Sequence, residues 1–412
     1  MLHGVRPRIH PMDHDVIVVG AGPVGARLAT VLAERGVDVL LMEEHASIGR
    51  PFQCAGLVNP WSMAQVGLQH TVLQDIDGAT IHGPHRASVS VGVSGEARTS
   101  AVCRNRFDEG VVQQAIKAGS SLLLSTKATG ILPVEGKGWR VHHQQGANTG
   151  TTTCRLLVGA DGAHSRVRHW LRSGRPKEIM IGNQVEVTGF RTDERWLEMF
   201  TGESIAPGFF AWAIPTGFGT HRIGLWSSPD RLEHASPEAL LHGLMHTSRH
   251  ADRFANCQIV ARYCGPIPGG MVRRPVRERA MLFGDAAGLA KPTTGGGIGP
   301  GFKQVSMVAD RLAEAIHADL LSETTLKKIA RPWDELKRHQ TRARALRNLF
   351  LTESDDDTLE RHVAVFAQPE VTEMINRLGD IEHPVPLGLE MLRKVPSFRP
   401  LALRAGWAML TA

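Results

Sequence analysis

The strongest hydrophobic pattern in the chain lies near its beginning. Residues 15–20 form an apolar run that passes directly into a glycine-rich turn, and an Ala/Leu-rich segment follows as far as Arg35. A second apolar run, residues 37–42, comes after Gly36. Apolar runs of this length between turn residues are typical of buried strands, and the Ala/Leu-rich segment is typical of a helix. The pattern therefore predicts a βαβ unit.

The turn of this unit has the spacing G-x-G-x-x-G, made by Gly20, Gly22 and Gly25. In a dinucleotide site the first glycine allows a tight turn, the second lets a pyrophosphate touch the backbone, and the third lets helix and strand pack closely. Glu43 follows the second strand, where a carboxylate can accept hydrogen bonds from both hydroxyls of a ribose. Because strand, helix and acid are in register, we predict one dinucleotide site here.

Two later segments also read as a buried strand, a sharp turn and a helix start. Residues 156–168 carry Asp161 in a Gly-Ala-Asp-Gly turn, and residues 280–288 carry Asp285 in a Gly-Asp-Ala-Ala-Gly turn. The part of the chain between these turns contains alternating apolar runs that are typical of an antiparallel sheet. These runs are residues 184–190, 208–214, 221–226 and 258–264.

The order of these patterns predicts an α/β fold in which the chain leaves a first domain and returns to it. From about residue 305 onward the pattern is helical. We predict four parts: a disordered tail (1–13), a discontinuous nucleotide-binding domain (14–60, 100–168 and 276–318), an α+β substrate domain (61–99 and 169–275), and a helical C-terminal domain (319–412).

Composition and charge narrow the class of protein. The 412 residues are 42% hydrophobic and 21% charged, as in a folded globular protein. Lys and Arg exceed Asp and Glu by 47 − 41 = +6, which favours anionic partners. The five cysteines have no C-x-x-C spacing, so we expect neither an iron–sulfur nor a zinc site and favour a reducing, cytoplasmic compartment. No stretch approaches the roughly 20 apolar residues of a membrane-spanning helix.

A basic segment, residues 327–347, has two interpretations. Such a run is most often the solvated face of a helix. It is also suited to docking on an anionic membrane or on an acidic electron carrier. Its eight cations, set against only Asp334 and Glu335, are Lys327, Lys328, Arg331, Lys337, Arg338, Arg342, Arg344 and Arg347.

Together, the glycine fingerprint and the two later turns resemble the flavoprotein monooxygenase-like superfamily, which binds FAD. Four further segments are similar to the geranylgeranyl reductase family, and the resemblance spans about residues 15–310. It departs from the family at Phe210, where Tyr is usual, and at Leu57, where glycine is frequent. The four segments are residues 48–56 with a Cys-Ala-Gly core, Arg104-x-x-Phe107-Asp108, Phe210-x-Trp212-x-Ile214-Pro215, and residues 291–298 with the sequence Lys-Pro-Thr-Thr-Gly-Gly-Gly-Ile.

The resemblance implies a Rossmann-like FAD-binding domain of the para-hydroxybenzoate hydroxylase type, interrupted by an antiparallel-sheet substrate domain. It also implies a set of cofactor contacts. Ala21, Pro23 and Gly25 would line the pyrophosphate, Glu43 the ribose, Ala128 the adenine, Arg104 the phosphates, Cys54 and Ala55 the flavin, and Asp285 the ribityl chain, with Asp161, Gly297 and Ile298 beside them.

Cys54 has two interpretations, a small buried apolar side chain or a thiol placed at the flavin. Reduction of an alkene requires a proton donor beside the hydride source, so Cys54 is the candidate catalytic residue. Phe210 and Trp212 alternate on a predicted strand and are candidates, together with Pro215 and Pro292, for contact with a prenyl chain.

Two functions fit these residues. The first is an FAD-dependent reductase of geranylgeranyl lipids that takes electrons from NAD(P)H or from a small acidic protein such as ferredoxin, with peripheral contact to an anionic membrane and no nucleic acid partner. The second is an FAD-dependent monooxygenase, hydroxylase or halogenase. Residues 210–215 are also similar to the W-x-W-x-I-P segment of flavin halogenases, although the lysine that those enzymes need is not matched.

Overall fold

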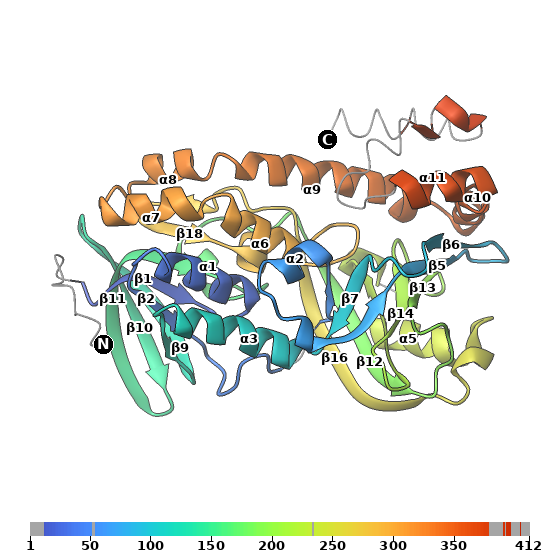
Figure 1. Ribbon diagram of the computed structural model, residues 1–412, viewed down its shortest axis with the longest axis horizontal. Coiled ribbons are helices and arrows are strands. Elements are labelled where there is room, and N and C mark those ends of the chain that lie inside the picture. Colours follow the sequence, from blue (N-terminus) through green and yellow to red (C-terminus); the bar gives the residue numbers. More distant parts are fainter. Residues whose placement is uncertain are drawn as a thin grey trace.

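Two large β-sheets lie end to end, and helices run along one edge of both (Figure 1). This computed structural model describes residues 12–51, 54–232, 235–378, 390–391, 393–396 and 404. The first sheet has eight strands in the order β17-β18-β11-β1-β2-β8, with β10 also paired to β11 and β9 paired to β10. Its strands are β1 (His14–Val19), β2 (Val39–Met42), β8 (Ser121–Leu123), β9 (Thr126–Val134), β10 (Gly138–Gln145), β11 (Asn148–Gly159), β17 (Val276–Arg277) and β18 (Ala280–Leu282).

The centre of this sheet is parallel and buried on both faces. Val16 and Val18 of β1 pack into the core shared with the helices, whereas Ile17 and Val19 pack on the opposite face. This alternation explains why β1 reads as a continuous apolar run. The predicted α/β class with a Rossmann-like sheet is confirmed. The helices of this half are α1 (Pro23–Ala33), α3 (Arg104–Lys117) and α4 (Arg166–Trp170).

The second sheet has seven strands, which include all four of the predicted alternating runs. Every neighbouring pair is antiparallel except β13 and β5, which are parallel. Helix α5 (Pro237–His246) covers one face, and the other face turns toward the first half. In spatial order the strands are β16 (Gln258–Gly269), β12 (Glu178–Thr188), β15 (Thr220–Ser227), β14 (Phe210–Pro215), β13 (Trp196–Thr201), β5 (Gly78–His82) and β6 (Ser88–Gly92).

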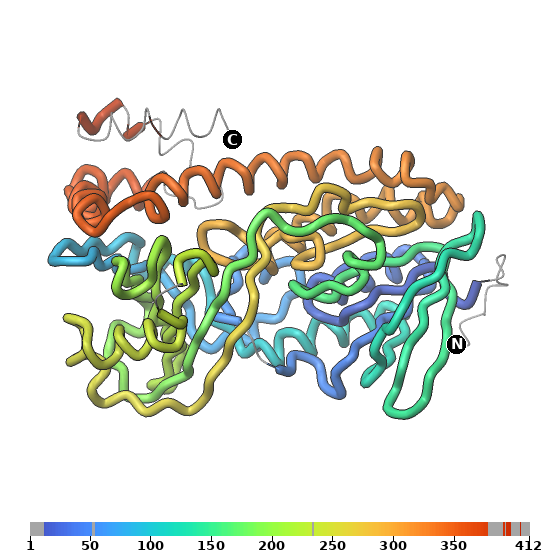
Figure 2. Tube along the Cα trace, turned by 180° about the vertical axis from the view of Figure 1, so that it is seen from behind, coloured from blue at the N-terminus to red at the C-terminus, as the bar shows by residue number. Residues whose placement is uncertain are grey.

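A small sheet and a helical segment complete the molecule. The small sheet pairs β3 (Leu57–Val58), β7 (Thr99–Val102) and β4 (Val72–Ile76), and α2 (Pro60–Ala64) follows β3. Figure 2 shows from behind that the C-terminal helices extend across both halves. They are α6 (Ile298–Ser306), α7 (Ala309–His317), α8 (Glu323–Ile329), α9 (Trp333–Arg347), the π-helical turn η5 (Asn348–Thr352), α10 (Asp356–Phe366) and α11 (Pro369–Leu378).

Two residues of the predicted disordered tail, Met12 and Asp13, are ordered. Met12 is buried, and the carboxylate of Asp13 accepts a hydrogen bond of 2.8 Å from the N–H of Thr153. Residues 12 and 13 are therefore not part of a disordered tail, because the side chain of Asp13 is bound to β11. Residues 1–11 lie outside the described residues, and so do most residues of the predicted C-terminal domain that follow residue 378.

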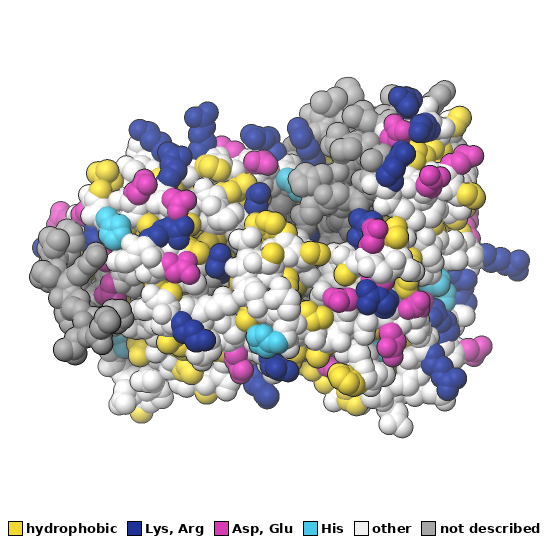
Figure 3. Space-filling model, viewed as in Figure 1, with side chains coloured by type: hydrophobic (Ala, Val, Ile, Leu, Met, Phe, Trp, Pro, Cys, Tyr) yellow, Lys and Arg dark blue, Asp and Glu magenta, His cyan; other side chains and the backbone are white. Residues whose placement is uncertain are grey.

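The basic segment is mostly exposed along α8 and α9. Six of its eight cations are exposed, Arg344 is half-buried, and Arg347 is buried. Figure 3 shows Lys and Arg side chains along the upper edge, where these helices lie. Arg347 is the exception to both interpretations of this segment, because its side chain points inward. Within the described part of the chain, no helix is both long and apolar enough to cross a bilayer.

Candidate active site

A cleft of about 680 Å³ begins at the carboxyl ends of β1 and β2 and extends to the second sheet. Of the predicted cofactor residues, only Gly25 and Ala55 do not line it. The fold therefore brings together predicted residues from segments far apart in the chain, and Pro266 and Ile267 of β16 add the second sheet to the lining. The predicted residues that line the cleft are Gly20, Ala21, Gly22, Pro23, Glu43, Cys54, Arg104, Ala128, Asp161, Asp285, Gly297 and Ile298.

The glycine turn leaves room at the N-terminus of α1. A Cβ on Gly20 would collide with the carbonyl oxygen of Ala160, and one on Gly25 would collide with the carbonyl oxygen of Gly20. A Cβ on Gly22, in contrast, would meet nothing within 4 Å. Two glycines thus permit close backbone packing and the third keeps open the space where helix N–H groups can meet an anion. This geometry fits the pyrophosphate of FAD.

Glu43 lies at the end of β2 with both carboxylate oxygens engaged. Oε2 accepts a hydrogen bond of 3.0 Å from the N–H of Ala21, and Oε1 accepts one of 3.0 Å from the N–H of His45. The His45 ring nitrogen Nδ1 is 2.6 Å from the same Oε1. Oε2 keeps a second lone pair, so the carboxylate is fixed in place and can still accept a hydrogen bond from a ribose hydroxyl.

The two predicted aspartates differ in their surroundings. Asp161 receives hydrogen bonds from the side chain of Ser165 and the N–H groups of Arg166 and Val167, so it caps α4 although it also lines the cleft. Asp285 is buried. Burial raises the pKa of its carboxyl group to about 6, although the positive charges of Arg104 and Arg168 act in the opposite direction. A Cβ on Gly297 would lie 2.6 Å from Asp285 Oδ1, so this glycine lets α6 begin directly beside the carboxylate.

Cys54 faces a charged pair on α3. Arg104 donates two hydrogen bonds to Asp108, of 2.9 and 2.8 Å. Burial opposes the charge of the guanidinium, but Asp108 and the neighbouring Cys54 hold the pKa of Arg104 above its ordinary value. The thiol also accepts a hydrogen bond of 3.3 Å from the N–H of Gly56. Arg104 is thus engaged with the chain itself, and its charge is partly balanced before any phosphate is bound.

Sequence reasoning missed two residues that hold the Cys54 segment. Arg222 on β15 donates hydrogen bonds to the carbonyl oxygens of Ala55 (2.9 Å) and Val102 (3.2 Å). Gln184 on β12 donates to the carbonyl oxygen of Cys54 (3.4 Å). The available signal was a polar residue within each predicted strand, since a buried arginine or glutamine needs hydrogen-bond partners.

An aromatic cluster adjoins this end of the cleft. Phe210 and Trp212 lie on one face of β14, and the indole N–H of Trp212 donates a hydrogen bond of 3.1 Å to Gln184. A Cβ on Gly295 would lie 3.6 Å from the ring of Trp226, so the glycine-rich loop contacts the cluster. The cluster consists of Met180, Phe209, Phe210 and Trp226, with Met199, Trp212, Ile267 and Leu351 packed against them.

The other two predicted substrate residues are placed differently. Pro215 is buried and pairs with His221, on the face of the sheet opposite Phe210 and Trp212. Pro292 is buried, and its carbonyl oxygen accepts a hydrogen bond of 3.1 Å from Arg347. The structure therefore does not bring Pro215 to the aromatic cluster, because strand residues an odd number apart face opposite sides.

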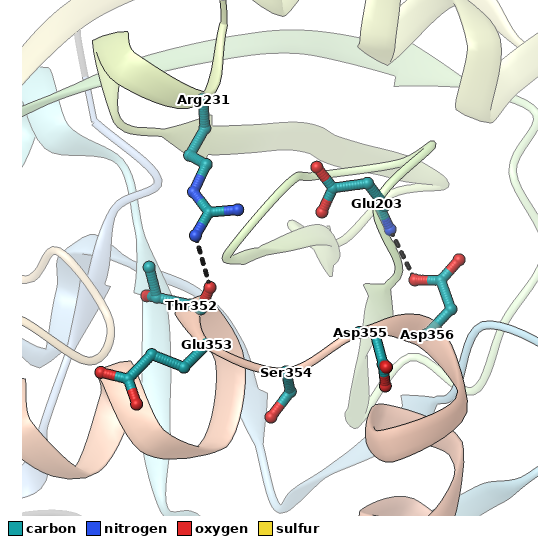
Figure 4. Close-up of a pocket in the computed structure, with 7 residues that line it drawn as sticks. All are labelled: Glu203, Arg231, Thr352, Glu353, Ser354, Asp355 and Asp356. Carbon is teal, nitrogen blue, oxygen red and sulfur yellow. Dashed lines mark hydrogen bonds between the residues drawn. The ribbon is translucent and has the colours of Figure 1, made fainter.

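A second, acidic hollow of about 270 Å³ lies where the second sheet meets η5 and α10 (Figure 4). Arg231 donates a hydrogen bond of 2.8 Å to the carbonyl oxygen of Thr352, and the N–H of Glu203 donates one of 2.8 Å to Asp356. Among the described residues, no group of three or more His, Cys, Asp or Glu side chains could hold a metal ion. The hydrogen bond from Arg231 fastens η5 at this junction, where Leu351 packs against the aromatic cluster.

Comparison with known proteins agrees with this geometry. The chain is 29% identical over 359 residues to a digeranylgeranylglycerophospholipid reductase of Methanosarcina acetivorans, covering 84% of this chain and 86% of that protein. It is 28% identical to a protein of the same name from Methanothrix thermoacetophila, covering 84% and 90%.

Solved structures share the fold. A geranylgeranyl bacteriochlorophyll reductase-like protein from Thermoplasma acidophilum superimposes with a TM-score of 0.83 at 22% identity, covering 95% of this chain and 99% of that one. The flavin-dependent brominase Bmp2 superimposes with a TM-score of 0.71 at 17% identity, covering 92% and 98%.

The comparison with family models identifies FAD as the cofactor. Residues 13–326 match the FAD binding domain family. The resemblance to geranylgeranyl reductases, the FAD cofactor and the oxidoreductase class predicted from the sequence are confirmed. This chain belongs to the FAD binding domain family and is an FAD-dependent oxidoreductase.

Proposed function

We propose that the protein is a reductase that saturates C=C double bonds in the geranylgeranyl chains of a lipid. The observation that carries this proposal is the aromatic cluster beside the Cys54 wall of the cleft. An isoprenoid chain is apolar and unsaturated, so a surface of aromatic and Met side chains suits it. The names of the two archaeal relatives support the same substrate class.

In the proposed reaction, FAD and Cys54 deliver different parts of the added hydrogen. Bound and reduced FAD supplies a hydride to one carbon of the double bond. The Cys54 thiol gives a proton to the other carbon, and solvent returns a proton to the sulfur afterwards. The sulfur accepts a hydrogen bond from the N–H of Gly56 and Arg104 lies beside it, so a donor and a positive charge face the atom that releases the proton. Phe210 and Trp212 hold the chain beside this thiol.

A second candidate is a monooxygenase or halogenase. Its support is the shared fold of the brominase and the W-x-I-P segment of β14. The two candidates differ in their need for oxygen, because only the reductase passes its electrons to an alkene.

An anaerobic experiment separates them. The bound flavin is reduced with dithionite, a geranylgeranyl glycerophospholipid is added, and absorbance near 450 nm is followed. Reoxidation without oxygen, with the reduced lipid identified by mass spectrometry, is the expected result. A flavin that remains reduced until air is admitted would reject the reductase in favour of a monooxygenase.

The electron donor and the location are part of the proposal. Residues 293–301 are glycine-rich but lack the dinucleotide spacing, so NAD(P)H would have to enter the same cleft as FAD, and an acidic ferredoxin is the alternative donor. Stopped-flow reduction by each donor distinguishes them. We propose a cytoplasmic protein that contacts anionic membrane through the exposed cations of α8 and α9.

A further inference from the structure

Helix α9 has an outer and an inner face. Its outer face carries exposed cations, whereas Trp333, Gln340 and Arg347 are 2%, 5% and 5% exposed. These three residues are seven positions apart, almost two full helical turns, so they lie on one line along the helix. Figures 1 and 2 show α9 extending across the joint between the two halves. The inner face is therefore placed to touch both.

Trp333 contacts the turn that carries Asp285. Its ring packs edge-on against Phe283 at 5.1 Å between centroids, and its N–H donates a hydrogen bond of 3.1 Å to the carbonyl oxygen of Gln304. The fully buried Gln304 side chain accepts from the N–H of Gly284 (2.8 Å) and donates to the carbonyl oxygen of Leu282 (3.1 Å). The beginning of the turn is thus fixed through α6 to α9.

Gln340 and Arg347 hold the segment that leads into the glycine-rich loop. Gln340 accepts from the N–H of Met271 (3.1 Å) and donates to the carbonyl oxygen of Ala290 (2.9 Å). Arg347 donates to the carbonyl oxygen of Pro292 (3.1 Å). Side chains from α9 thus satisfy two backbone carbonyls that lie close together in the sequence, which fixes the path of the chain.

Arg347 also connects this loop to the substrate side. Its guanidinium forms two hydrogen bonds with Glu178 at the start of β12, of 2.9 and 2.8 Å. It lies over the ring of Phe209 in the aromatic cluster, 4.9 Å from the centroid. One buried side chain therefore contacts the loop, the second sheet and the cluster together.

We propose that Trp333, Gln340 and Arg347 are positioning residues that hold the wall of the cleft from Gly284 to Gly297 and thereby set the reduction potential of FAD. This wall ends at the N-terminus of α6, where unpaired N–H groups favour negative charge. A wall that is free to move stabilises a reduced, anionic ring less well than a fixed one. The three residues lie beyond residue 326, where the match to the FAD binding domain family ends. The proposal requires bound FAD but not a particular substrate.

The test uses the FAD-loaded protein without lipid. Gln340→Met removes both Gln340 hydrogen bonds at similar volume. Arg347→Met combined with Glu178→Gln removes the ion pair without leaving a buried charge. Arg342→Met is the control, because Arg342 lies exposed on the same helix. Site-resolved hydrogen exchange is compared between residues 284–297 and β1, and the midpoint potential is measured by dye-linked titration.

We expect exchange in residues 284–297 to accelerate at least tenfold in both inner-face variants, with β1 unchanged. We expect the preference for reduced over oxidised FAD to fall about tenfold, which is about 30 mV in a two-electron couple. Loop exchange and a potential equal to those of Arg342→Met would overturn the proposal, as would equal acceleration in β1. If the double variant does not fold, Gln340→Met alone decides. A wrong substrate assignment leaves both readouts unaffected.

Discussion

The two ends of the cleft are built by different means. The nucleotide end is built mainly on backbone, with the glycine turn, the N-terminus of α1 and Glu43 all between residues 15 and 43, and Ala128 and Asp161 join it from later strands and turns. The end at Cys54 consists of side chains from α3, β12, β14 and β15, and from loops far apart in the sequence. A site made of local backbone has a readable spacing. A site made of distant side chains exists only after the chain has folded.

The largest expected effect comes from filling the space at the nucleotide end. Gly22→Val should fold normally, since a Cβ there meets nothing within 4 Å, but its side chain would occupy the place of the pyrophosphate. We expect FAD affinity to fall at least about 10³-fold, roughly 4 kcal/mol. Flavin absorbance of the purified protein and titration of the apoprotein measure this. Gly130→Val, in open space on β9, is the control. A fully yellow Gly22→Val protein would contradict the assignment of this end.

The same contrast explains what the sequence could predict. The βαβ unit, Glu43 and the two aspartate turns follow from apolar runs and glycine spacing, and nearly all their predicted residues line the cleft. The alternating runs indicated the strands of the second sheet, but neither their order nor the parallel pairing of β5 with β13. The parallel pairing joins segments more than 100 residues apart, and no local pattern encodes either this pairing or the strand order.

Individual residues show the limit more clearly. Arg347 was one of eight cations in a basic run, and only tertiary packing turns it inward to Glu178. Asp161 lines the cleft, but the sequence did not show that its carboxylate also accepts hydrogen bonds from the first N–H groups of α4. Phe210 and Trp212 were singled out, but their partners Trp226 and Gln184 come from other strands.

The halves should also differ in their response to acid. In the second half, burial lowers the pKa of His221 on β15 and of His250 after α5 to about 4 each. These rings stay neutral in the fold but bind protons when unfolded, so stability should fall as pH drops from about 6.5 to 4. In the first half, burial raises the pKa of Asp285 to about 6, so this carboxyl group has the opposite effect on stability. Its contribution to the free energy of unfolding falls as pH rises from about 4 to 6. Two histidines outweigh one aspartate.

We therefore expect the free energy of unfolding to rise between pH 4 and 6.5. His221→Phe should reduce the slope of this free energy against pH by one proton, about 1.4 kcal/mol per pH unit, because it removes one titrating ring. The variant should still fold, because neither ring nitrogen of His221 has a hydrogen-bond partner to lose. Urea titrations at a series of pH values measure the slope. His70→Gln, at an exposed position, should leave it unchanged. An identical slope in His221→Phe would mean that His221 does not titrate on unfolding.

At the Cys54 end, a change of chemistry should not disturb the nucleotide end. Cys54→Ala should keep FAD, because the glycine turn and Glu43 are held by contacts that do not involve its thiol, but slow alkene reduction about 10²-fold if the thiol is the proton donor. Single-turnover reoxidation of reduced flavin by the lipid measures this step. Cys264→Ala, an exposed thiol, is the control. Unchanged turnover at full FAD content would make Cys54 a packing residue only.

The smallest expected effect is on binding of the protein to anionic membrane, because the two ends of the cleft receive their ligands from different places. The nucleotide end takes a soluble cofactor, whereas the proposed substrate resides in a membrane, so recruitment should depend on where surface charge lies. Arg338 and Arg342 are exposed one turn apart on α9, and each cation near an anionic bilayer contributes about 1 kcal/mol. Arg338→Gln with Arg342→Gln should therefore weaken binding to anionic vesicles about 30-fold at low salt, measured by sedimentation.

The matched control separates the position of charge from its amount. Arg86→Gln with Arg191→Gln removes the same charge from exposed positions on other elements. If α9 docks on the bilayer, the control variant should bind like the unmodified protein, and high salt should release both. Equal weakening in the two double variants would show that net charge alone attracts the protein. Equal binding of the unmodified protein to neutral and anionic vesicles would leave the outer face of α9 as an ordinary solvated surface, and the lipid would then have to reach the aromatic cluster by another route.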